Sequence, residues 1–419
     1  MANLVKQETL VERWVVPGEF NPRSNSQILA YMEHIGHKGK PSKHSKTDTA
    51  SADESALRGL AAKNRFFKSL LEFRKIDKLK STYVTSNLGR LDTNDRVHPK
   101  FLPKPTTWRL SCVDPNWQNI PARDIDDEDS LTRTFRQCVV ASPGCVLVEA
   151  DFAGIEAVQT GYFANDPDYI RLSRHGIHAY LTSFKVGEPA DLSWPEEQLA
   201  AHLAYIKKKY KDDIVYFAMK RGVHLTNYGG SPWMMQRAEP SIFPTVKAAK
   251  EVQDFYLDLV PKLKVWQSKL RERAARENFL GGNDHPYKFR HWFWDVVAYD
   301  KNGRQKPGAD WNKVVSFYPQ STAAGVLYDA VLRLQDPLSC HYVGDMFDGK
   351  TPLRALIHDS IVAEVPKDKL EPFLERLTGS MLEPLRAQPL DHTWGMGDFL
   401  QIDVDVKVGL NWGDMESVV

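Results

Sequence analysis

The chain has 419 residues, of which 42% are hydrophobic and 26% charged, a balance typical of globular domains. Its 55 Lys and Arg residues nearly equal its 54 Asp and Glu residues, which excludes a uniformly basic surface but permits local basic strips. No apolar run is long enough to span a bilayer and the first residues lack a signal-peptide core, so we expect a cytoplasmic protein with no membrane partner. The four cysteines form no Cys-x-x-Cys pair, which argues against a zinc site or a disulfide framework.

Periodicity and turn residues predict the elements in chain order. We expect a helix at 26–35, a basic loop at 37–51, helices through 55–83, extended loops and short strands at 92–123, two short strands at 131–148, helices across most of 168–277, a hairpin in 287–312 with its turn at Asn302-Gly303, a helix at 321–334, and strands in 353–365 and 400–409. This order predicts an α+β protein whose sheet is interrupted by a helical insertion.

The stretch from Val146 to Ile170 combines a short apolar strand, a carboxylate at Asp151 and a helical pattern that Asn165-Asp166-Pro167 ends. A carboxylate at a strand end sits on a rigid rim, where it can bind a metal. The alternative is that Asp151 only caps the following helix.

A second carboxylate, Asp359, lies between two apolar runs in the sequence His358-Asp359-Ser360, which predicts a hairpin turn. Two carboxylates brought together from distant parts of the chain would hold two divalent cations for phosphoryl transfer. Such hard oxygen ligands suit Mg²⁺.

The third stretch, 213–233, carries Tyr216, Lys220, His224 and Tyr228 at every fourth position, on one face of a predicted helix. A lysine between ring side chains can hold a triphosphate while a ring stacks on a base. The alternative is a buried amphipathic helix with a snorkelling lysine.

Donors of hydrogen bonds to phosphates and base edges concentrate in 106–123, which contains Arg109, Gln118, Asn119 and Arg123. Gln320 is expected near the start of a helix within 316–331. The basic residues of 55–83 form either a solvated face or a surface along a nucleic-acid backbone.

These segments, in this order, resemble the A-family, polymerase I-like DNA polymerases. The matching segments are TTWRLSCVDPNWQNIPAR at 106–123, DFAGIEAV at 151–158, the Tyr216 to Gly229 helix, SFYPQSTAA at 316–324, His358-Asp359-Ser360, the thumb-like FNPRSNSQIL and LLEFRKIDKLKSTYV, and VGLNWGDM at the end.

The resemblance implies a right-hand polymerase with an antiparallel-sheet palm and mainly helical fingers and thumb. The implied boundaries are a thumb at 1–95, palm at 96–160 and 316–419, and fingers at 161–315. It implies a monomer that adds dNTPs to the primer 3′-hydroxyl of primer-template DNA by a two-metal mechanism, with Mg²⁺ or Mn²⁺.

Residue roles are carried over from the same resemblance. Asp151 and Asp359, with the Phe152 carbonyl, would bind the metals. Glu156 would lie under the sugar and pair with Tyr228, while Lys220 would hold the triphosphate and protonate pyrophosphate. His178, Tyr216 and His224 would also contact the nucleotide, and the DNA contacts would be Arg109, Gln118, Asn119, Arg123, Gln320 and His358.

The chain departs from the family pattern at several of these positions. Tyr216 stands in place of a phosphate-gripping Arg, His224 in place of a stacking Phe or Tyr, and Ser360 in place of an acid. We also expect no proofreading exonuclease, and the brevity favours a phage or mobile-element enzyme or a shortened piece of a longer one.

Two rival functions remain open on the sequence alone. A single-subunit RNA polymerase would share the palm, but Glu156 would obstruct a ribose 2′-hydroxyl. An inactive DNA-binding clamp descended from a polymerase is disfavoured because Asp151, Asp359 and Lys220 are all present.

Overall fold

The computed structural model describes residues 20–37, 51–61, 63–103, 106–121, 130–240 and 242–418. The chain divides into two compact units, one made of residues 1–97 and 231–253 and the other of residues 98–230 and 254–419. None of the described helices is long and apolar enough to cross a membrane.

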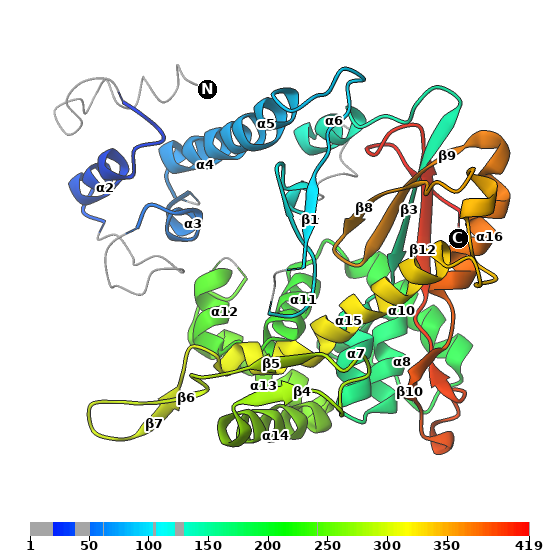
Figure 1. Cartoon of the computed structure of the whole chain (residues 1–419). Coiled ribbons are helices and arrows are strands. Elements are labelled where there is room, and N and C mark those ends of the chain that lie inside the picture. Colours follow the sequence, from blue (N-terminus) through cyan, green and yellow to red (C-terminus); the bar gives the residue numbers. More distant parts are fainter. Residues whose placement is uncertain are drawn as a thin grey trace. The chain divides into compact units, whose positions relative to one another are not determined.

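The first unit is helical in its described part (Figure 1). It contains α2 (Asn25–His34), α3 (Glu54–Ala61), α4 (Arg65–Lys78), a π-helical segment (Leu79–Thr85), α5 (Ser86–Leu88) and α12 (Pro232–Ala238). The Asn64 side chain accepts a hydrogen bond from Phe66 N and starts α4, so the helical run expected through 55–83 breaks between α3 and α4. Ile28, Phe67 and Leu70 are fully buried and form the core between these helices.

The second unit is built on an antiparallel five-stranded sheet with the order β13-β12-β3-β9-β8. The strands are β3 (Cys145–Phe152), β8 (Leu353–Ile357), β9 (Ser360–Pro366), β12 (Val404–Gly409) and β13 (Glu416–Ser417). β3 lies in the middle of the sheet, paired with β12 on one side and β9 on the other. Alternate residues of β3, including the fully buried Val148 and Ala150, present an apolar face to the core. The expected α+β class and the strands around 358–359 are therefore confirmed.

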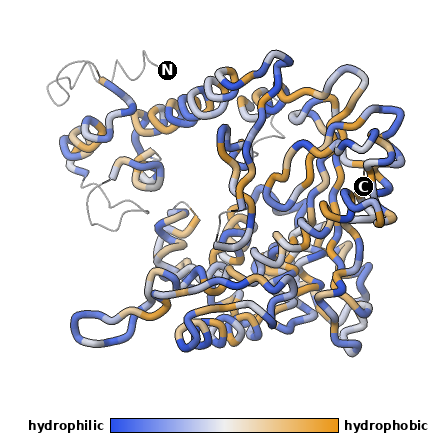
Figure 2. The backbone as a smooth tube through the Cα atoms, viewed as in Figure 1, coloured by the Kyte–Doolittle hydropathy of each residue, from blue (hydrophilic) through white to orange (hydrophobic). Residues whose placement is uncertain are grey.

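Helices α7 (Ile155–Phe163), α15 (Trp311–Gln335) and α16 (Leu370–Met381) bury apolar residues in the same core as the sheet. The helical insertion expected across 168–277 is confirmed. Its helices are α8 (Pro167–His175), α9 (Ile177–Lys185), α10 (Glu196–Tyr210), α11 (Ile214–Asn227), α13 (Val246–Leu259) and α14 (Pro261–Glu277), and the tube in Figure 2 shows hydrophobic and hydrophilic stretches alternating along them. Residues 246–253 of α13 belong to the first unit and the rest of that helix to the second.

Short hairpins complete this unit. β1 (Lys100–Leu102) pairs with β2 (Ser111–Val113), β4 (Phe279–Gly281) with β5 (Arg290–Trp292), β6 (Val297–Tyr299) with β7 (Gln305–Pro307), and β10 (Leu385–Pro389) with β11 (Phe399–Leu400). Tyr299 is in register with Gln305, so the expected turn at Asn302-Gly303 is confirmed.

Two expected elements are wrong. The segment expected as the first strand of 131–148 is a helix, α6 (Leu131–Gln137), because the Ser130 side chain accepts a hydrogen bond from Thr132 N and caps it. Helix α15 begins at Trp311 and runs through Pro319, which places Gln320 in its interior rather than near its N-terminus. The helix continues through the proline because it is buried along most of its length, so tertiary packing outweighs the lost backbone hydrogen bond.

Candidate active site

The register of the central strands brings the two candidate carboxylates together. Asp151 at the end of β3 is paired with Ser360 at the start of β9, and Asp359 lies in the turn just before it. Phe152 N donates a hydrogen bond to the Asp359 carbonyl over 3.3 Å, and His358 takes the left-handed φ of +56° that closes the turn. An antiparallel sheet therefore joins two residues that are far apart in sequence.

The electrostatics of this corner favour a cation. Loss of hydration, followed by the negative charges of Asp359 and Glu149, raises the pKa of Asp151 to about 7, although its side chain still reaches solvent. Neighbouring carboxylates that repel one another bind a divalent cation through hard oxygen ligands. The described residues contain no group of three or more His, Cys, Asp and Glu side chains that could hold a metal.

Arg109 is the cation at this corner. Its guanidinium donates to Asp359 Oδ1 and Oδ2 over 3.1 and 3.2 Å and also to Glu156. The Arg109 Nε is buried and has no hydrogen-bond partner among the described residues. Burial opposes the charge, but the two carboxylates outweigh it and raise the Arg109 pKa. Arg109 therefore contacts Asp359 and Glu156 together, with one positive charge against two carboxylates.

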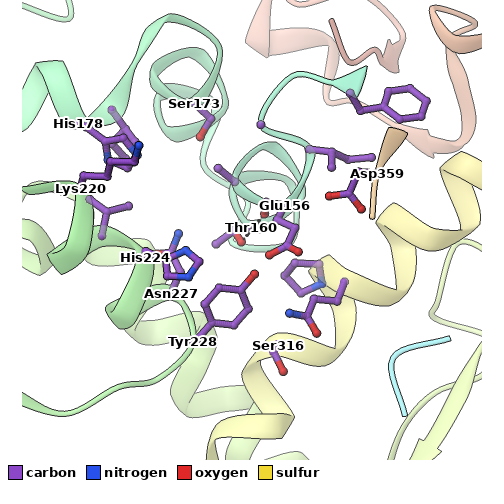
Figure 3. Close-up of a pocket in the computed structure, with 18 of the residues that line it drawn as sticks. Glu156, Thr160, Ser173, His178, Lys220, His224, Asn227, Tyr228, Ser316 and Asp359 are labelled. Carbon is purple, nitrogen blue, oxygen red and sulfur yellow. Dashed lines mark hydrogen bonds between the residues drawn. The ribbon is translucent and has the colours of Figure 1, made fainter. Parts of the chain in front are cut away.

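Glu156 lies in the first turn of α7, which begins after Gly154 in the left-handed conformation with φ +59°. Burial is the largest influence on Glu156 and raises its pKa, while Arg109 and a hydrogen bond from Gln320 oppose the rise. Figure 3 shows the Tyr228 hydroxyl directed toward the Glu156 carboxylate. No hydrogen bond joins these two side chains among the described residues, so the expected pairing with Tyr228 is replaced here by the contacts with Arg109 and Gln320.

Helix α11 presents a second set of functional side chains. Asp213 accepts a hydrogen bond from Val215 N and fixes the start of the helix. Lys220, His224 and Tyr228 lie along a cavity of about 1450 Å³. Tyr216, one turn earlier, is instead buried, with its ring 6.4 Å from the His178 ring and edge-on to it.

His178 lies beside Lys220 at the end of the cavity away from Asp359 (Figure 3). It follows Gly176, whose φ of +118° turns the chain from α8 into α9. Burial, reinforced by the positive charges of Lys220 and His224, lowers the pKa of His178 to about 4. Its Nδ1 is buried and unpaired among the described residues, so the neutral ring has an atom available to a ligand.

The cavity gathers most of the predicted site residues. Its walls include Arg109, Asp151, Phe152, Glu156, His178, Lys220, His224, Tyr228, Gln320, His358 and Asp359. Gln118 is not among the lining residues; its Nε2 donates to the Leu356 carbonyl over 3.2 Å. Asn119 lies in a 3₁₀ turn (Trp117–Asn119), and Arg123 lies outside the described residues.

Sequence reasoning missed several lining residues. Phe217 and Arg221 lie on α11 one turn apart, next to the row formed by Lys220 and His224, and the helical period could have identified them. Thr160, Ser173, Asn227 and Ser316 also line the cavity, and no sequence pattern singles them out.

The C-terminal end of α11 is held by a closed set of buried hydrogen bonds. The Tyr169 and Tyr256 hydroxyls are 2.7 Å apart, and Asn227 joins both, donating to Tyr169 over 2.8 Å and accepting from Tyr256 over 2.7 Å. From α14, Gln267 donates to the Thr226 carbonyl over 3.0 Å. These bonds fix the position of Asn227 and of Tyr228, which follows it, against α8, α13 and α14.

The fold and this site together define the class. A solved structure, the POL domain of Pol1 from M. smegmatis in complex with a DNA primer-template and a dNTP, matches with a TM-score of 0.73 at 20% identity, over 98% of this chain and 65% of that one. The fold is therefore that of a DNA polymerase domain.

The family follows from the sequence comparisons. The family model for DNA polymerase family A matches residues 3–414, and the chain belongs to that family. It is 26% identical over 405 residues to the thermostable DNA polymerase I of Thermus filiformis, covering 94% of this chain and 42% of that protein. The DNA polymerase I of Lactococcus lactis subsp. lactis is 25% identical, over 83% of this chain and 36% of that protein. The chain thus spans about two-fifths of the length of these curated relatives.

Proposed function

We propose that this chain is a DNA-directed DNA polymerase that adds dNTPs to a primer 3′-hydroxyl on a template strand and releases pyrophosphate. The observation that carries the proposal is the polarity of the cavity, with Asp151 and Asp359 at one end and Lys220 and His178 at the other. A nucleotide in this space would have its reacting phosphate near the carboxylates and its distal phosphates near the cationic end. Positioning and charge stabilisation of this kind are the main requirements of phosphoryl transfer.

Two divalent cations, Mg²⁺ or alternatively Mn²⁺, would be held by Asp151, Asp359 and the Phe152 carbonyl. The donor set fits such ions because it offers hard oxygen ligands. Loss of hydration, followed by the negative charge of Asp359, raises the pKa of Asp151, and a bound cation would counteract both effects. When bound, the ions would align the hydroxyl nucleophile with the departing phosphate. Arg109, which contacts Asp359 and Glu156, would exchange these carboxylates for the DNA.

The remaining roles concern the chain's own side chains. Lys220 would bind the triphosphate and give a proton to the leaving pyrophosphate, and neutral His178 would donate or accept a hydrogen bond at the same phosphates. Glu156 would occupy the space of a ribose 2′-hydroxyl. The other proposed nucleotide contacts are His224, Tyr228 and Tyr216, the last from its buried position, and the proposed DNA contacts are Arg109, Gln118, Asn119, Arg123, Gln320 and His358.

For the thumb, palm and fingers of a right-hand polymerase we propose the boundaries predicted from the sequence. The thumb would be 1–95, the palm 96–160 with 316–419, and the fingers 161–315. The enzyme would act as a monomer. Its origin in a phage or mobile element stays a prediction from the sequence.

A primer-extension assay tests the proposed function. Purified protein is given a labelled primer on a longer template, with dNTPs or rNTPs, and with or without Mg²⁺. The proposal expects Mg²⁺-dependent extension with dNTPs only. Extension with rNTPs would favour the RNA polymerase, and binding without extension would favour the inactive clamp.

The expected lack of 3′→5′ exonuclease activity is tested separately. A labelled single strand is incubated with this chain and Mg²⁺, without nucleotides. Shortening that is abolished by a substitution within this chain would overturn the expectation.

A further inference from the structure

The two hairpins between α14 and α15 expose large aromatic rings. Trp292 is 47% exposed, Trp294 75% and Tyr299 63%. Phe293 between the two tryptophans is only 1% exposed, because successive residues of an extended chain point to opposite sides. The same alternation that buries Phe293 in the core therefore puts Trp292 and Trp294 on one outward face.

The two exposed tryptophans form an ordered stack. Their ring centroids are 5.5 Å apart and their planes differ by 4°. Trp292 rests in turn against Phe279, with centroids 5.2 Å apart. With Trp292 covering one side of Trp294, a further flat ring can be added on the other side.

The backbone that carries this stack is firmly held. The Asp310 carboxylate accepts hydrogen bonds from Trp294 N and Asp295 N, each over 3.1 Å, and Gly308 N donates to the Val296 carbonyl over 3.0 Å. The tryptophans are thus presented on a fixed frame, which lowers the ordering cost of binding.

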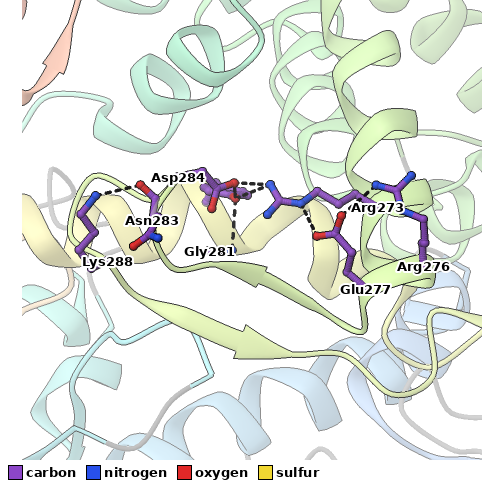
Figure 4. A network of polar contacts seen from close by, with 8 residues as sticks. Arg273, Arg276, Glu277, Gly281, Asn283, Asp284 and Lys288 are labelled. Carbon is purple, nitrogen blue, oxygen red and sulfur yellow. Dashed lines mark hydrogen bonds and ion pairs between the residues drawn. The ribbon is translucent and has the colours of Figure 1, made fainter.

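The base of the first hairpin is also anchored. Asp284, in the loop after β4, pairs with Arg273 of α14 and accepts a hydrogen bond of 2.6 Å from the Tyr318 hydroxyl of α15. The same hydroxyl accepts a hydrogen bond of 3.2 Å from Gly281 N (Figure 4). Both neighbouring helices therefore hold the hairpin.

The two hairpins carry more positive than negative charge. Residues 288–307 contain the cations Lys288, Arg290, Lys301, Arg304 and Lys306 against the two carboxylates Asp295 and Asp300. Both carboxylates bond to backbone: Asp300 accepts from Asn302 N and Arg304 N over 2.8 and 2.9 Å, and Asp295 accepts from Ala309 N over 2.9 Å.

Three of the cations, Lys301, Arg304 and Lys306, lie on the β6–β7 hairpin. All three are exposed, and no ion pair in the described part of the chain involves them. Figure 2 shows the tip of this hairpin as a hydrophilic loop extending from the rest of the unit.

We propose that Trp292 and Trp294, with Lys301, Arg304 and Lys306, bind single-stranded template DNA. Stacked exposed rings followed along the chain by a hairpin with exposed cations suit a single strand, because bases stack on the rings while phosphates meet the cations. A duplex would keep its bases paired and away from the rings. The basic charge also disfavours a purely apolar protein partner.

The strand is the template overhang, and this assignment rests on the proposed function. Helix α15 begins at Trp311, directly after the hairpins, and lines the cavity from Val315, about 6 Å of helix rise later. Ahead of a primer that ends in the cavity, the template is the strand that continues unpaired.

Fluorescence anisotropy without nucleotides tests the inference. The probes are a labelled blunt duplex and the same duplex with a ten-nucleotide 5′ template overhang. Trp294→Ala is expected to weaken binding of the overhang probe about tenfold and to leave blunt-duplex binding within about twofold, in the range measured for loss of one stacked base. Trp294→Phe, which keeps a flat ring, is expected to recover most of the loss.

Two further variants complete the design. Tyr205→Ala removes an exposed ring beside Lys209 on α10 and is the matched control, expected to bind both probes like the wild type. The triple variant Lys301→Ala, Arg304→Ala, Lys306→Ala is expected to reduce the slope of log affinity against log salt for the overhang probe by about 2, since each lost phosphate contact on a single strand removes about 0.7.

An equal loss on both probes, or no loss with Trp294→Ala, would overturn the inference. The binding experiment and the primer-extension assay can give different results, so each proposal can fail without the other. If the wild type binds the overhang through Trp294 but does not extend a primer, the proposed polymerase activity fails while the single-strand site stands.

Discussion

At the scale of single residues, the central feature is Arg109, a single cation held between two carboxylates. It contacts both Asp359 and Glu156, two side chains with separate proposed roles. Under the proposed function, Arg109 would leave these carboxylates for the DNA when the substrate binds.

We predict that Asp151→Ala and Asp359→Ala each lower the extension rate by roughly a thousandfold or more while changing primer-template affinity less than about threefold. The carboxylates would act on the metals, which contribute several kcal/mol to the transition state, whereas DNA affinity comes from cations on phosphate. Single-turnover extension and anisotropy are the measurements.

The control for these variants is Asp405→Ala. Asp405 is opposite Asp151 in the β3–β12 register but does not line the cavity, so this variant should keep most of its activity. Near-normal extension by Asp151→Ala or Asp359→Ala would show that the metal site has been misplaced.

Glu156→Ala is predicted to admit ribonucleotides. The ratio of kcat/KM for a matched dNTP to that for the rNTP should fall by roughly a hundredfold or more, because the side chain excludes a 2′-hydroxyl and leaves it unpaired. Glu156→Gln separates shape from charge, since it keeps the volume and should keep most of the selectivity. A ratio that does not change in the alanine variant would remove Glu156 from the sugar site.

Lys220→Ala is predicted to lower kcat/KM for dNTP by about a hundredfold, with primer-template affinity unchanged. The ammonium group would meet the charge that develops on the leaving group, an interaction worth about 3 kcal/mol when one such donor is lost. Steady-state kinetics measure the first quantity and anisotropy the second. Lys185→Ala, on α9 with its ammonium over the Phe255 ring and outside the cavity lining, is the matched control. An unchanged kcat/KM in Lys220→Ala would contradict the role given to α11.

At the scale of elements, the site depends on how α11 is attached to its neighbours. The Tyr169–Tyr256–Asn227 hydrogen bonds join α8, α13 and the end of α11, and both tyrosines are almost fully buried. Burial raises the pKa of Tyr169 to about 12, so its hydroxyl keeps its proton at neutral pH.

Tyr256→Phe is predicted to reduce the free energy of unfolding by about 1–3 kcal/mol, because it leaves the buried Asn227 Oδ1 without its donor. It should also raise KM for dNTP, since Asn227 lines the cavity and precedes Tyr228. Urea denaturation and steady-state kinetics are the measurements. Tyr205→Phe, which alters an exposed hydroxyl, is the control and should change neither value. Equal stability of Tyr256→Phe and the wild type would show that water replaces the lost donor.

At the scale of the whole molecule, buried histidines make stability depend on pH. His285 is 1% exposed, accepts a hydrogen bond from Tyr287 N at Nδ1, and lies 2.8 Å from Ser321 Oγ through Nε2. Burial, with a smaller contribution from Lys288, lowers its pKa to about 4, and Asp284 only partly opposes this.

The sign of this effect follows from proton linkage. Between about pH 6.5 and pH 4 the unfolded chain binds a proton at His285 that the folded chain does not, so the folded state loses stability as the pH falls. Over this range the free energy of unfolding falls by up to about 3 kcal/mol. Asp151 has the opposite effect, because folding raises its pKa to about 7. Its contribution to the free energy of unfolding therefore increases as the pH falls below about 7.

The test compares the free energy of unfolding of the wild type and of His285→Gln at a series of pH values. Taking the difference between the two proteins removes the contributions of Asp151 and of the other groups that both proteins contain. The stability advantage of the wild type measured by urea denaturation at pH 7.5 should shrink as the pH is lowered to 4.5. Parallel pH curves for the two proteins would show that His285 is not the group responsible.

The identity of the site's chemical groups and much of the local structure can be predicted from the amino-acid sequence. The turn at 358–359, the end of the helix before Asn165-Asp166-Pro167 and the helical row of Lys220, His224 and Tyr228 all depend on residues close together in the chain. Local propensity, capping and periodicity act over a few residues, and a sequence shows them directly.

The way in which these groups come together follows from long-range packing. The β3–β9 register places Asp359 beside Asp151, the Arg109 guanidinium joins Asp359 to Glu156, and Tyr216 turns into the interior although it shares a helical row with Lys220. Helix α15 likewise runs through Pro319 because burial outweighs local preference. Each of these outcomes depends on packing between residues far apart in sequence, and neither composition nor periodicity carries that information.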